Sequence, residues 1–270
     1  PPFFKVASIP LYLIFGFSPD IATITNLIFY IVLILSVFFI TKKIVSSEAG
    51  LLACFLVSTI PYLIGLSRFY LLDFSFISMT LLGIAIFINS ENFKNRKYSI
   101  TFGIVFGLGM LTRINYFLIL GPTILFMILL YSLKLKWSLN QTKNLIFSAL
   151  FAFFIFFQWF FRHSVGVLNY LHNQATLDWS VIEEGNPVWN SFDGIAYYIK
   201  GSYIVFSKFY FILFLLSMLI ILIYLYKNKN KLIEEKNIIT LGLLFFFIFS
   251  WIVFTYLGNK DLRFISSIYP

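Results

Sequence analysis

Asp73 and Arg68 stand beside apolar sequence instead of within a run of charges. They flank the apolar residues 69–72 at the junction between two long apolar segments, where a tight polar hairpin would usually carry Gly, Asn or Ser. If the junction is helical, their spacing brings the two side chains together, and one interpretation is a local ion pair. The functional interpretation is a carboxylate and a cation that face a cavity.

Arg113 closes an apolar segment, residues 98–112, that is too short to cross a membrane. At about 1.5 Å per residue, a helix of this length falls well short of the roughly 30 Å hydrocarbon core. An arginine inside the bilayer is costly unless it reaches water or lies in a cavity. We favour the cavity. Gly103 and Gly107 precede Arg113 at the spacing of a small-residue helix-packing motif, which is the interpretation we prefer over a nucleotide-binding loop.

Lys260 and Arg263 follow the last long apolar segment, with Asp261 between them. Cations at the end of an apolar helix can be simple interfacial anchors. They could instead bind a lipid phosphate, to which the guanidinium of arginine is suited by its rigid fork of donors and its lasting charge. Both interpretations remain open at this stage.

No metal site is predicted. His163 and His172 lack the close spacing and the neighbouring carboxylates of a zinc site, and Cys54 is the single cysteine. We therefore expect no cofactor; a divalent cation is compatible with the sequence, but nothing indicates one.

The composition places these residues in a membrane. The chain has 270 residues, of which 60% are hydrophobic and 11% charged, whereas soluble domains are near 45–50% apolar and about 25% charged. The formal net charge of +9 would suggest nucleic acid in a soluble protein, but in a membrane protein Lys and Arg mainly set orientation. We expect a lipid bilayer as the surrounding medium and no nucleic acid as a partner.

The apolar segments predict an all-α, polytopic transmembrane bundle that forms a single domain over residues 1–270. Residues 1–19 are too short to cross and predict a juxtamembrane helix, and residues 163–200 predict an outer loop that could hold another. We expect about eight spans: residues 21–40, 51–66, 74–88, 98–112, 116–133, 145–161, 203–226 and 238–257.

The Lys and Arg residues indicate the orientation, because cytoplasmic loops carry an excess of them. One set of alternate loops holds the larger share and is predicted to be cytoplasmic. The residues of this set are Lys42, Lys43, Lys94, Arg96, Lys97, Lys134, Lys136, Lys143, Lys227, Lys229, Lys231 and Lys236. Asp73 and Arg113 lie on the other side, which is therefore the predicted working face.

Four stretches of the chain resemble motifs of the GT-C superfamily of membrane glycosyltransferases, specifically the protein mannosyltransferase and lipid A aminoarabinose transferase-like group (glycosyltransferase family 39-like). Residues 1–3 (Pro-Pro-Phe) resemble the family's proline-proline-leucine sequence before a juxtamembrane helix. Residues 68–73 (Arg-Phe-Tyr-Leu-Leu-Asp) are similar to its arginine-tyrosine-isoleucine-leucine-leucine-aspartate stretch, and residues 107–113 to its glycine-rich helix ending in threonine-lysine. Residues 260–264, with 269–270, resemble its arginine-tyrosine and leucine-proline motif.

The resemblance implies that a sugar moves from a polyprenyl phosphate to a hydroxyl of a lipid or protein acceptor, in an outward-facing cavity at the plasma membrane. Asp73 would then be a catalytic carboxylate that orients or deprotonates the acceptor. Arg113, Lys260 and Arg263 would bind the donor phosphate and stabilise charge that develops on it, with Arg68 in a supporting role.

The family also places a further catalytic acidic residue upstream of the proline pair, before residue 1 of this sequence. We therefore expect the chain to be a fragment of a longer enzyme and to be inactive alone.

Two other classes of function are open. A membrane transporter or lipid flippase would carry ionisable residues near the bilayer midplane and internally repeated halves. Here the isolated charges gather at one face and no repeat is evident. A structural membrane subunit without a site is the other alternative, and Arg113 at the end of a shortened helix argues only mildly against it.

Overall fold

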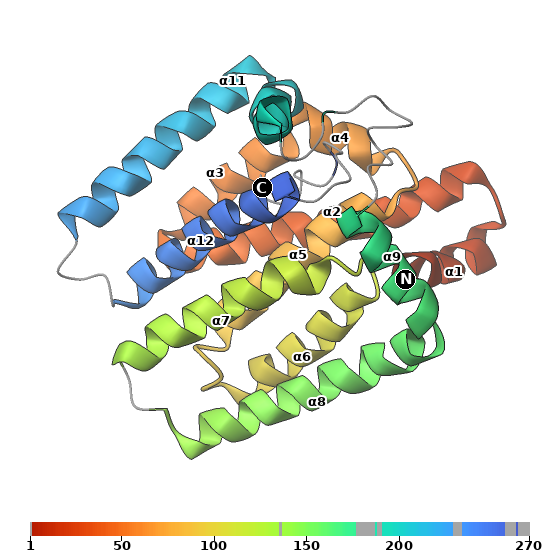
Figure 1. Ribbon diagram of the computed structural model, residues 1–270, viewed down its shortest axis with the longest axis horizontal. Coiled ribbons are helices and arrows are strands. Elements are labelled where there is room, and N and C mark those ends of the chain that lie inside the picture. The colour runs from red at the N-terminus through yellow and green to blue at the C-terminus, as the bar shows by residue number, and fades with distance from the viewer. Residues whose placement is uncertain are drawn as a thin grey trace.

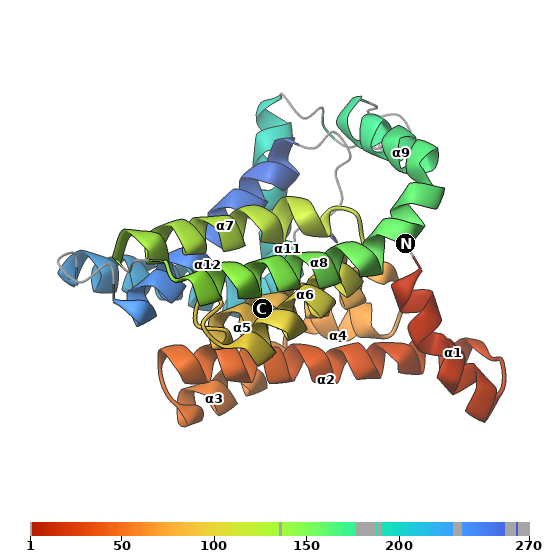
Figure 2. The ribbon, with the colours of Figure 1, turned by 90° about the horizontal axis from the view of Figure 1, so that it is seen from below.

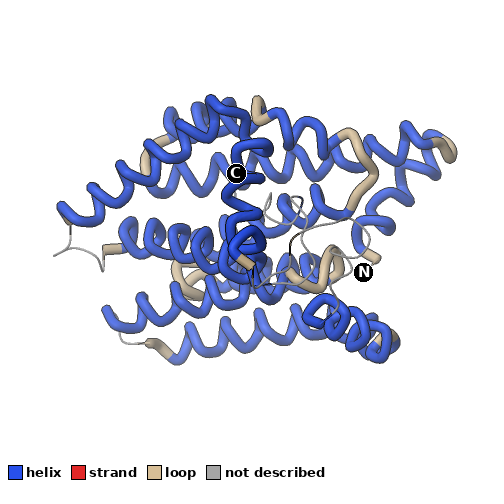
Figure 3. The backbone as a smooth tube through the Cα atoms, turned by 45° about the horizontal axis from the view of Figure 1, so that its top comes forward, coloured by secondary structure: helices blue, strands red, loops and turns tan. Residues whose placement is uncertain are grey.

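The chain folds into a bundle of helices in a computed structural model that describes residues 2–134, 137–176, 187, 191–228, 234–256 and 263. Every regular element in this described part is a helix (Figure 3), so the predicted all-α class is confirmed. The helices are α1 Phe3–Phe15, α2 Pro19–Ile44, α3 Ser47–Ser58, α4 Pro61–Ser67, α5 Leu72–Asn89, α6 Arg96–Met110, α7 Tyr116–Lys134, α8 Leu139–Arg162, α9 Ser164–Thr176, α11 Phe192–Lys227 and α12 Glu235–Tyr256.

Six of the described helices are long and apolar enough to cross a membrane, and α3 with α4 makes a seventh if this bent pair counts as one span. Each of the eight predicted spans coincides with a helix or with this bent pair. The one that is not counted by length is the predicted span 98–112, where α6 has only 15 residues. The predicted span 51–66 is also not straight, because its two helices meet at an angle of 68° just before Pro61, whose ring cannot continue a helix from the preceding turn.

The two predicted juxtamembrane regions contain helices. α1 has 13 residues and is apolar, so it is too short to cross. α9 occupies the start of the predicted outer loop, whose residues 177–186 and 188–190 lie outside the described part.

α5 is the central helix of the bundle (Figure 1). It packs against α2, α6 and α7, and most of its side chains are buried. Its hydroxyl groups are satisfied within the helix: Ser78 donates to the carbonyl oxygen of Phe74 and Thr80 to that of Phe76. Such back-bonding lets small polar residues lie in an apolar core, where they allow neighbouring helices to approach.

The short helix α6 packs closely against α8, as the small-residue motif predicts. A Cβ atom added at Gly103 would lie 2.1 Å from the backbone oxygen of Ser148. One added at Gly107 would lie 2.8 Å from the Cβ of Ile155. Only glycine fits at these two positions, so the packing interpretation of the motif is confirmed.

The bundle has two distinct ends (Figures 1 and 2). At one end lie the C-terminal ends of α2, α5, α7 and α11, and we call it the lysine-rich end. The cations whose side chains are described there are Lys42, Lys43, Lys94, Arg96, Lys97, Lys143, Lys227 and Lys236. At the other end lie α1, α9, the start of α5 and the turn between α6 and α7, and we call it the Asp73 end.

Candidate active site

The Asp73 end contains a buried ion pair between Asp73 and Arg113. Asp73 lies in the first turn of α5, and Arg113 lies in the turn that joins α6 to α7. Nη1 of Arg113 donates a short hydrogen bond to Oδ1 of Asp73, and the two side chains are only 15% and 8% exposed. The positive end of the α5 dipole also favours a carboxylate at this position. Two of the predicted site residues are thus brought together across 40 positions of sequence.

An aromatic ring also lies beside the Arg113 guanidinium. Its central carbon lies 5.8 Å from the ring centre of Phe76, one turn after Asp73 on α5. A cation near an aromatic face is stabilised by the ring quadrupole, most strongly where water is excluded. The carboxylate and the ring together compensate for the loss of water around a buried guanidinium.

Tyr116 fixes the turn that carries Arg113. Its backbone N–H donates to the carbonyl oxygen of Arg113 at 3.1 Å, and its hydroxyl donates to the carbonyl oxygen of Met79 on α5 at 3.2 Å. The ring fits where only glycine leaves room, since a Cβ at Gly109 would lie 2.2 Å from it and one at Gly83 would lie 2.7 Å from its hydroxyl. Tyr116 is completely buried and so connects α5, α6 and the Arg113 turn.

The segment that leads into Asp73 is held by α2. Nδ2 of Asn26 donates to the backbone oxygen of Phe69 at 2.6 Å, and Asn26 is fully buried. Sequence reasoning missed both Asn26 and Tyr116. For Asn26 a signal was present, because a polar amide within the apolar run 21–40 needs a hydrogen-bonding partner. Tyr116 gave none, since a tyrosine is unremarkable at the start of a span.

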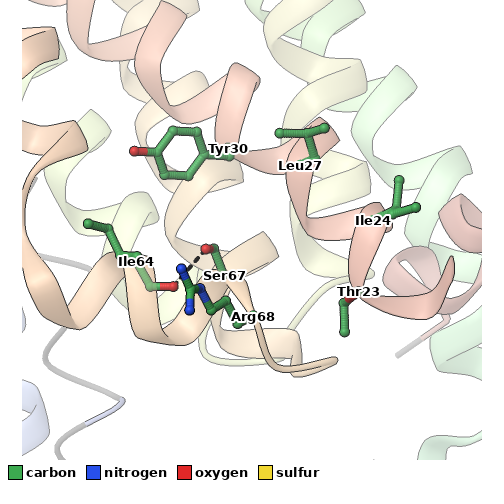
Figure 4. A pocket seen from close by; sticks show the side chains of 7 residues that line it. All are labelled: Thr23, Ile24, Leu27, Tyr30, Ile64, Ser67 and Arg68. Atoms are coloured by element: carbon green, nitrogen blue, oxygen red, sulfur yellow. Dashed lines mark hydrogen bonds between the residues drawn. The ribbon is translucent and has the colours of Figure 1, made fainter. Parts of the chain in front are cut away.

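Arg68 does not pair with Asp73, so the local ion pair is not formed. The side chain lies instead at a separate cavity of about 420 Å³ between α2 and α4, shown in Figure 4. Arg68 is exposed, and in the described part of the chain no carboxylate lies within ion-pair distance of it. The residues that line this cavity are Thr23, Ile24, Leu27, Tyr30, Ile64, Ser67 and Arg68.

Two further predicted site residues lie near the C-terminal end of the sequence. Lys260 lies outside the described residues, and Arg263 is partly exposed. The ring of His163 stacks on Trp159 at 4.7 Å. Among the described residues, no three His, Cys, Asp or Glu side chains lie together as metal ligands would.

Comparison with known proteins shows the family. A model of the dolichyl-phosphate-mannose-protein mannosyltransferase family matches residues 1–160, which is more than half of the chain and includes Arg68, Asp73 and Arg113. Comparisons with curated proteins and with solved structures gave no match. The matched region contains three of the four stretches that carry the resemblance to GT-C glycosyltransferases, and the resemblance is confirmed. The chain belongs to the dolichyl-phosphate-mannose-protein mannosyltransferase family and is a membrane glycosyltransferase whose family implies a lipid-linked sugar donor.

Proposed function

We propose that this protein transfers a sugar from a polyprenyl-phosphate donor to a hydroxyl group of a lipid or protein acceptor, on the extracytoplasmic face of the plasma membrane. The observation that carries the proposal is the buried pair of Asp73 and Arg113. Both residues come from stretches that resemble family motifs, and both lie within the matched region. A carboxylate can accept the proton of an acceptor hydroxyl, and a guanidinium can stabilise the charge on a leaving phosphate.

The distribution of charge supports the proposed face. The cations of the turns after α2 and α5 lie at the lysine-rich end, and the ion pair lies at the opposite end of the bundle (Figure 1). Because cytoplasmic loops carry the excess of Lys and Arg, the Asp73 end is then extracytoplasmic. A pair at one end of the bundle also fits an enzyme at the membrane surface better than a transporter, whose ionisable groups are expected near the midplane.

The proposed reaction breaks one bond and forms another at the anomeric carbon of the sugar. The acceptor oxygen bonds to this carbon, and the bond from the carbon to the phosphate oxygen breaks, so the lipid phosphate leaves with the electron pair. Asp73 orients the acceptor hydroxyl and receives its proton. Arg113 stabilises the negative charge that develops on the leaving phosphate, in surroundings that contain little water.

The other predicted cations have supporting roles in this proposal. Lys260 and Arg263 would bind the donor phosphate, and both lie beyond the residues that the family model matches. Arg68 would attract the anionic donor from its place at the cavity between α2 and α4, since its charge has no described carboxylate partner there. These three assignments are predictions from sequence.

The test is the substitution Asp73→Asn, assayed as sugar transfer from a polyprenyl-phosphate donor by the purified full-length protein. We expect transfer to fall by at least about 100-fold, because the loss of a positioned acid–base group typically costs 10²–10⁴-fold. Asparagine preserves the shape of the side chain but leaves the Arg113 guanidinium without its carboxylate. Transfer is therefore expressed per amount of folded protein, which thermal unfolding measures.

The matched control is Asp193→Asn. Asp193 also forms an ion pair, with Lys200 at 2.7 Å, but its side chain is 68% exposed. Its substitution should leave transfer unchanged. Full transfer by the Asp73 variant, or equal losses in both variants, would contradict the role of Asp73.

A further inference from the structure

α1 contacts both segments that carry the ion pair. At its first residue, the backbone N–H of Phe3 donates to the carbonyl oxygen of Leu111 at 2.9 Å. Leu111 is the C-terminal cap of α6 and lies two residues before Arg113. The first N–H groups and the last C=O groups of helices have no partner within their own helix. The bond between Phe3 and Leu111 satisfies one such N–H group of α1 and one such C=O group of α6. It also connects α1 to the Arg113 turn.

The middle of α1 contacts the segment that leads to Asp73. The hydroxyl of Ser8 donates to the carbonyl oxygen of Lys5 at 2.7 Å and lies 2.8 Å from the hydroxyl of Tyr70. In this hydrogen bond either hydroxyl could be the donor. Ser8 is only 1% exposed, and the ring of Tyr70 lies 4.7 Å from that of Phe4.

We propose that α1 is a positioning element for the active site. Its positioning residue is Ser8, and Tyr70 is the positioning residue in the segment before α5. A helix is rigid over a span of 13 residues, so the two contacts fix the distance between the Leu111 turn and the Tyr70 segment. Arg113 and Asp73 follow these segments by two and three residues. The geometry of the ion pair therefore depends on α1, although no residue of α1 belongs to the pair.

Tyr12, one turn after Ser8 on α1, also interacts with the Tyr70 and Ser8 side chains. The helix lies at the edge of the bundle (Figure 2) and packs mainly against α2. Much of its surface is exposed and apolar, as expected for a helix in contact with lipid. Its exposed large apolar side chains are Val6, Ile9, Leu13, Ile14 and Phe15. The polar contacts of Phe3, Ser8 and Tyr12 are therefore the connections between this helix and the site.

The inference rests on the proposed function, and its test has one arm that measures transfer. Tyr70→Phe removes only the Tyr70 hydroxyl and keeps the ring in contact with Phe4. Ser8→Ala removes the Ser8 hydroxyl from the same hydrogen bond. We expect each variant to lower kcat by about 10-fold, as misplacement of reacting groups does, with the donor KM within about twofold of its original value. The kcat of the double variant should be no lower than that of the more impaired single variant, because both changes remove the hydrogen bond between Ser8 and Tyr70.

The control is Tyr210→Phe. The hydroxyl of Tyr210 is hydrogen-bonded to Thr59, so this change removes a similar bond between α11 and the end of α3. Its kcat should not change. Unchanged kcat in the Tyr70 and Ser8 variants, or the same loss in the Tyr210 variant, would overturn the inference.

A second arm does not depend on activity. Amide hydrogen exchange should become faster at residues 69–72 and 111–116 in the Tyr70→Phe variant, and remain unchanged at the lysine-rich end. If the unmodified protein transfers no sugar but exchange changes in this pattern, the proposed function fails and the coupling through α1 stands. If exchange is unchanged at both segments, the coupling fails whatever the activity.

Discussion

The two ends of the bundle hold charged groups of the same types in different surroundings. At the Asp73 end, Arg113 and Asp73 form a pair whose side chains are 15% and 8% exposed, beside the ring of Phe76. At the lysine-rich end, Lys43 lies 3.2 Å from Glu91 and 3.5 Å from Glu235, and these three side chains are 33%, 50% and 47% exposed.

The difference in exposure decides what each cluster contributes. A half-exposed ion pair is screened by water and salt, and is typically worth about 0–1 kcal/mol. A buried pair contributes little net stability, but removal of one partner leaves an uncompensated charge and costs about 3–5 kcal/mol. Retention of such a pair at one end of a membrane protein indicates a functional role more strongly than the exposed cluster does.

The largest effect is expected for Arg113→Met. The substitution leaves the carboxylate of Asp73 buried without its partner, so the free energy of unfolding should fall by about 3–5 kcal/mol. Thermal unfolding of the purified protein in detergent measures this loss. If Arg113 stabilises the leaving phosphate as proposed, sugar transfer should also be abolished.

The double variant Asp73→Asn with Arg113→Met separates the two losses. Without any buried charge, most of the stability should return, while transfer should remain absent. A double variant as unstable as the single variant would show that the pair is not held by its charges.

A smaller effect is expected for Gly103→Ala. This variant tests whether the packing of α6 against α8, in the middle of the bundle, also holds the Asp73–Arg113 pair in place. α6 joins the turn at Asn95 to the turn at Arg113, and a methyl group at Gly103 would collide with the backbone of Ser148. Overpacking of this kind costs about 1–3 kcal/mol, which thermal unfolding would detect. Gly166→Ala in α9 is the control, because nothing lies within 4 Å of the added atom. Equal stability of the two variants would mean that α8 shifts to accept the methyl group.

The smallest effect is expected for Lys43→Met at the lysine-rich end. Unfolding free energy should fall by less than about 1 kcal/mol, less still at high salt, and transfer should be unchanged. A loss comparable to that of Arg113→Met would remove the contrast between the two ends.

The sequence identified several residues of the candidate site one by one, but it did not predict which of them contact one another. Asp73 and Arg113 were both identified as isolated charges, yet the only pairing that their positions suggested was Arg68 with Asp73. That pairing relied on distance along the chain. The observed partner depends on the packing of α5 against α6 and α7, which places Arg113 beside the first turn of α5.

Patterns that depend on neighbouring residues were predicted well. The spacing of Gly103 and Gly107 indicated helix packing, and the partner helix proved to be α8. The start of α2 likewise depends on neighbouring residues, because the hydroxyl of Ser18 accepts the N–H of Ile21 there. Hydropathy alone does not show whether a short apolar helix such as α6 crosses the membrane or is buried by its neighbours.

The sequence by itself determined that this is a helical membrane protein, with its cations concentrated in alternate turns. The physical reason is local: apolar segments of sufficient length must satisfy their backbone groups within one helix in lipid, and Lys and Arg remain where water is available. Only the tertiary structure decided that Asp73 meets Arg113, that Arg68 faces another cavity, and that α1 connects the two segments of the site. These contacts join residues far apart in sequence, and they follow from how whole helices pack together.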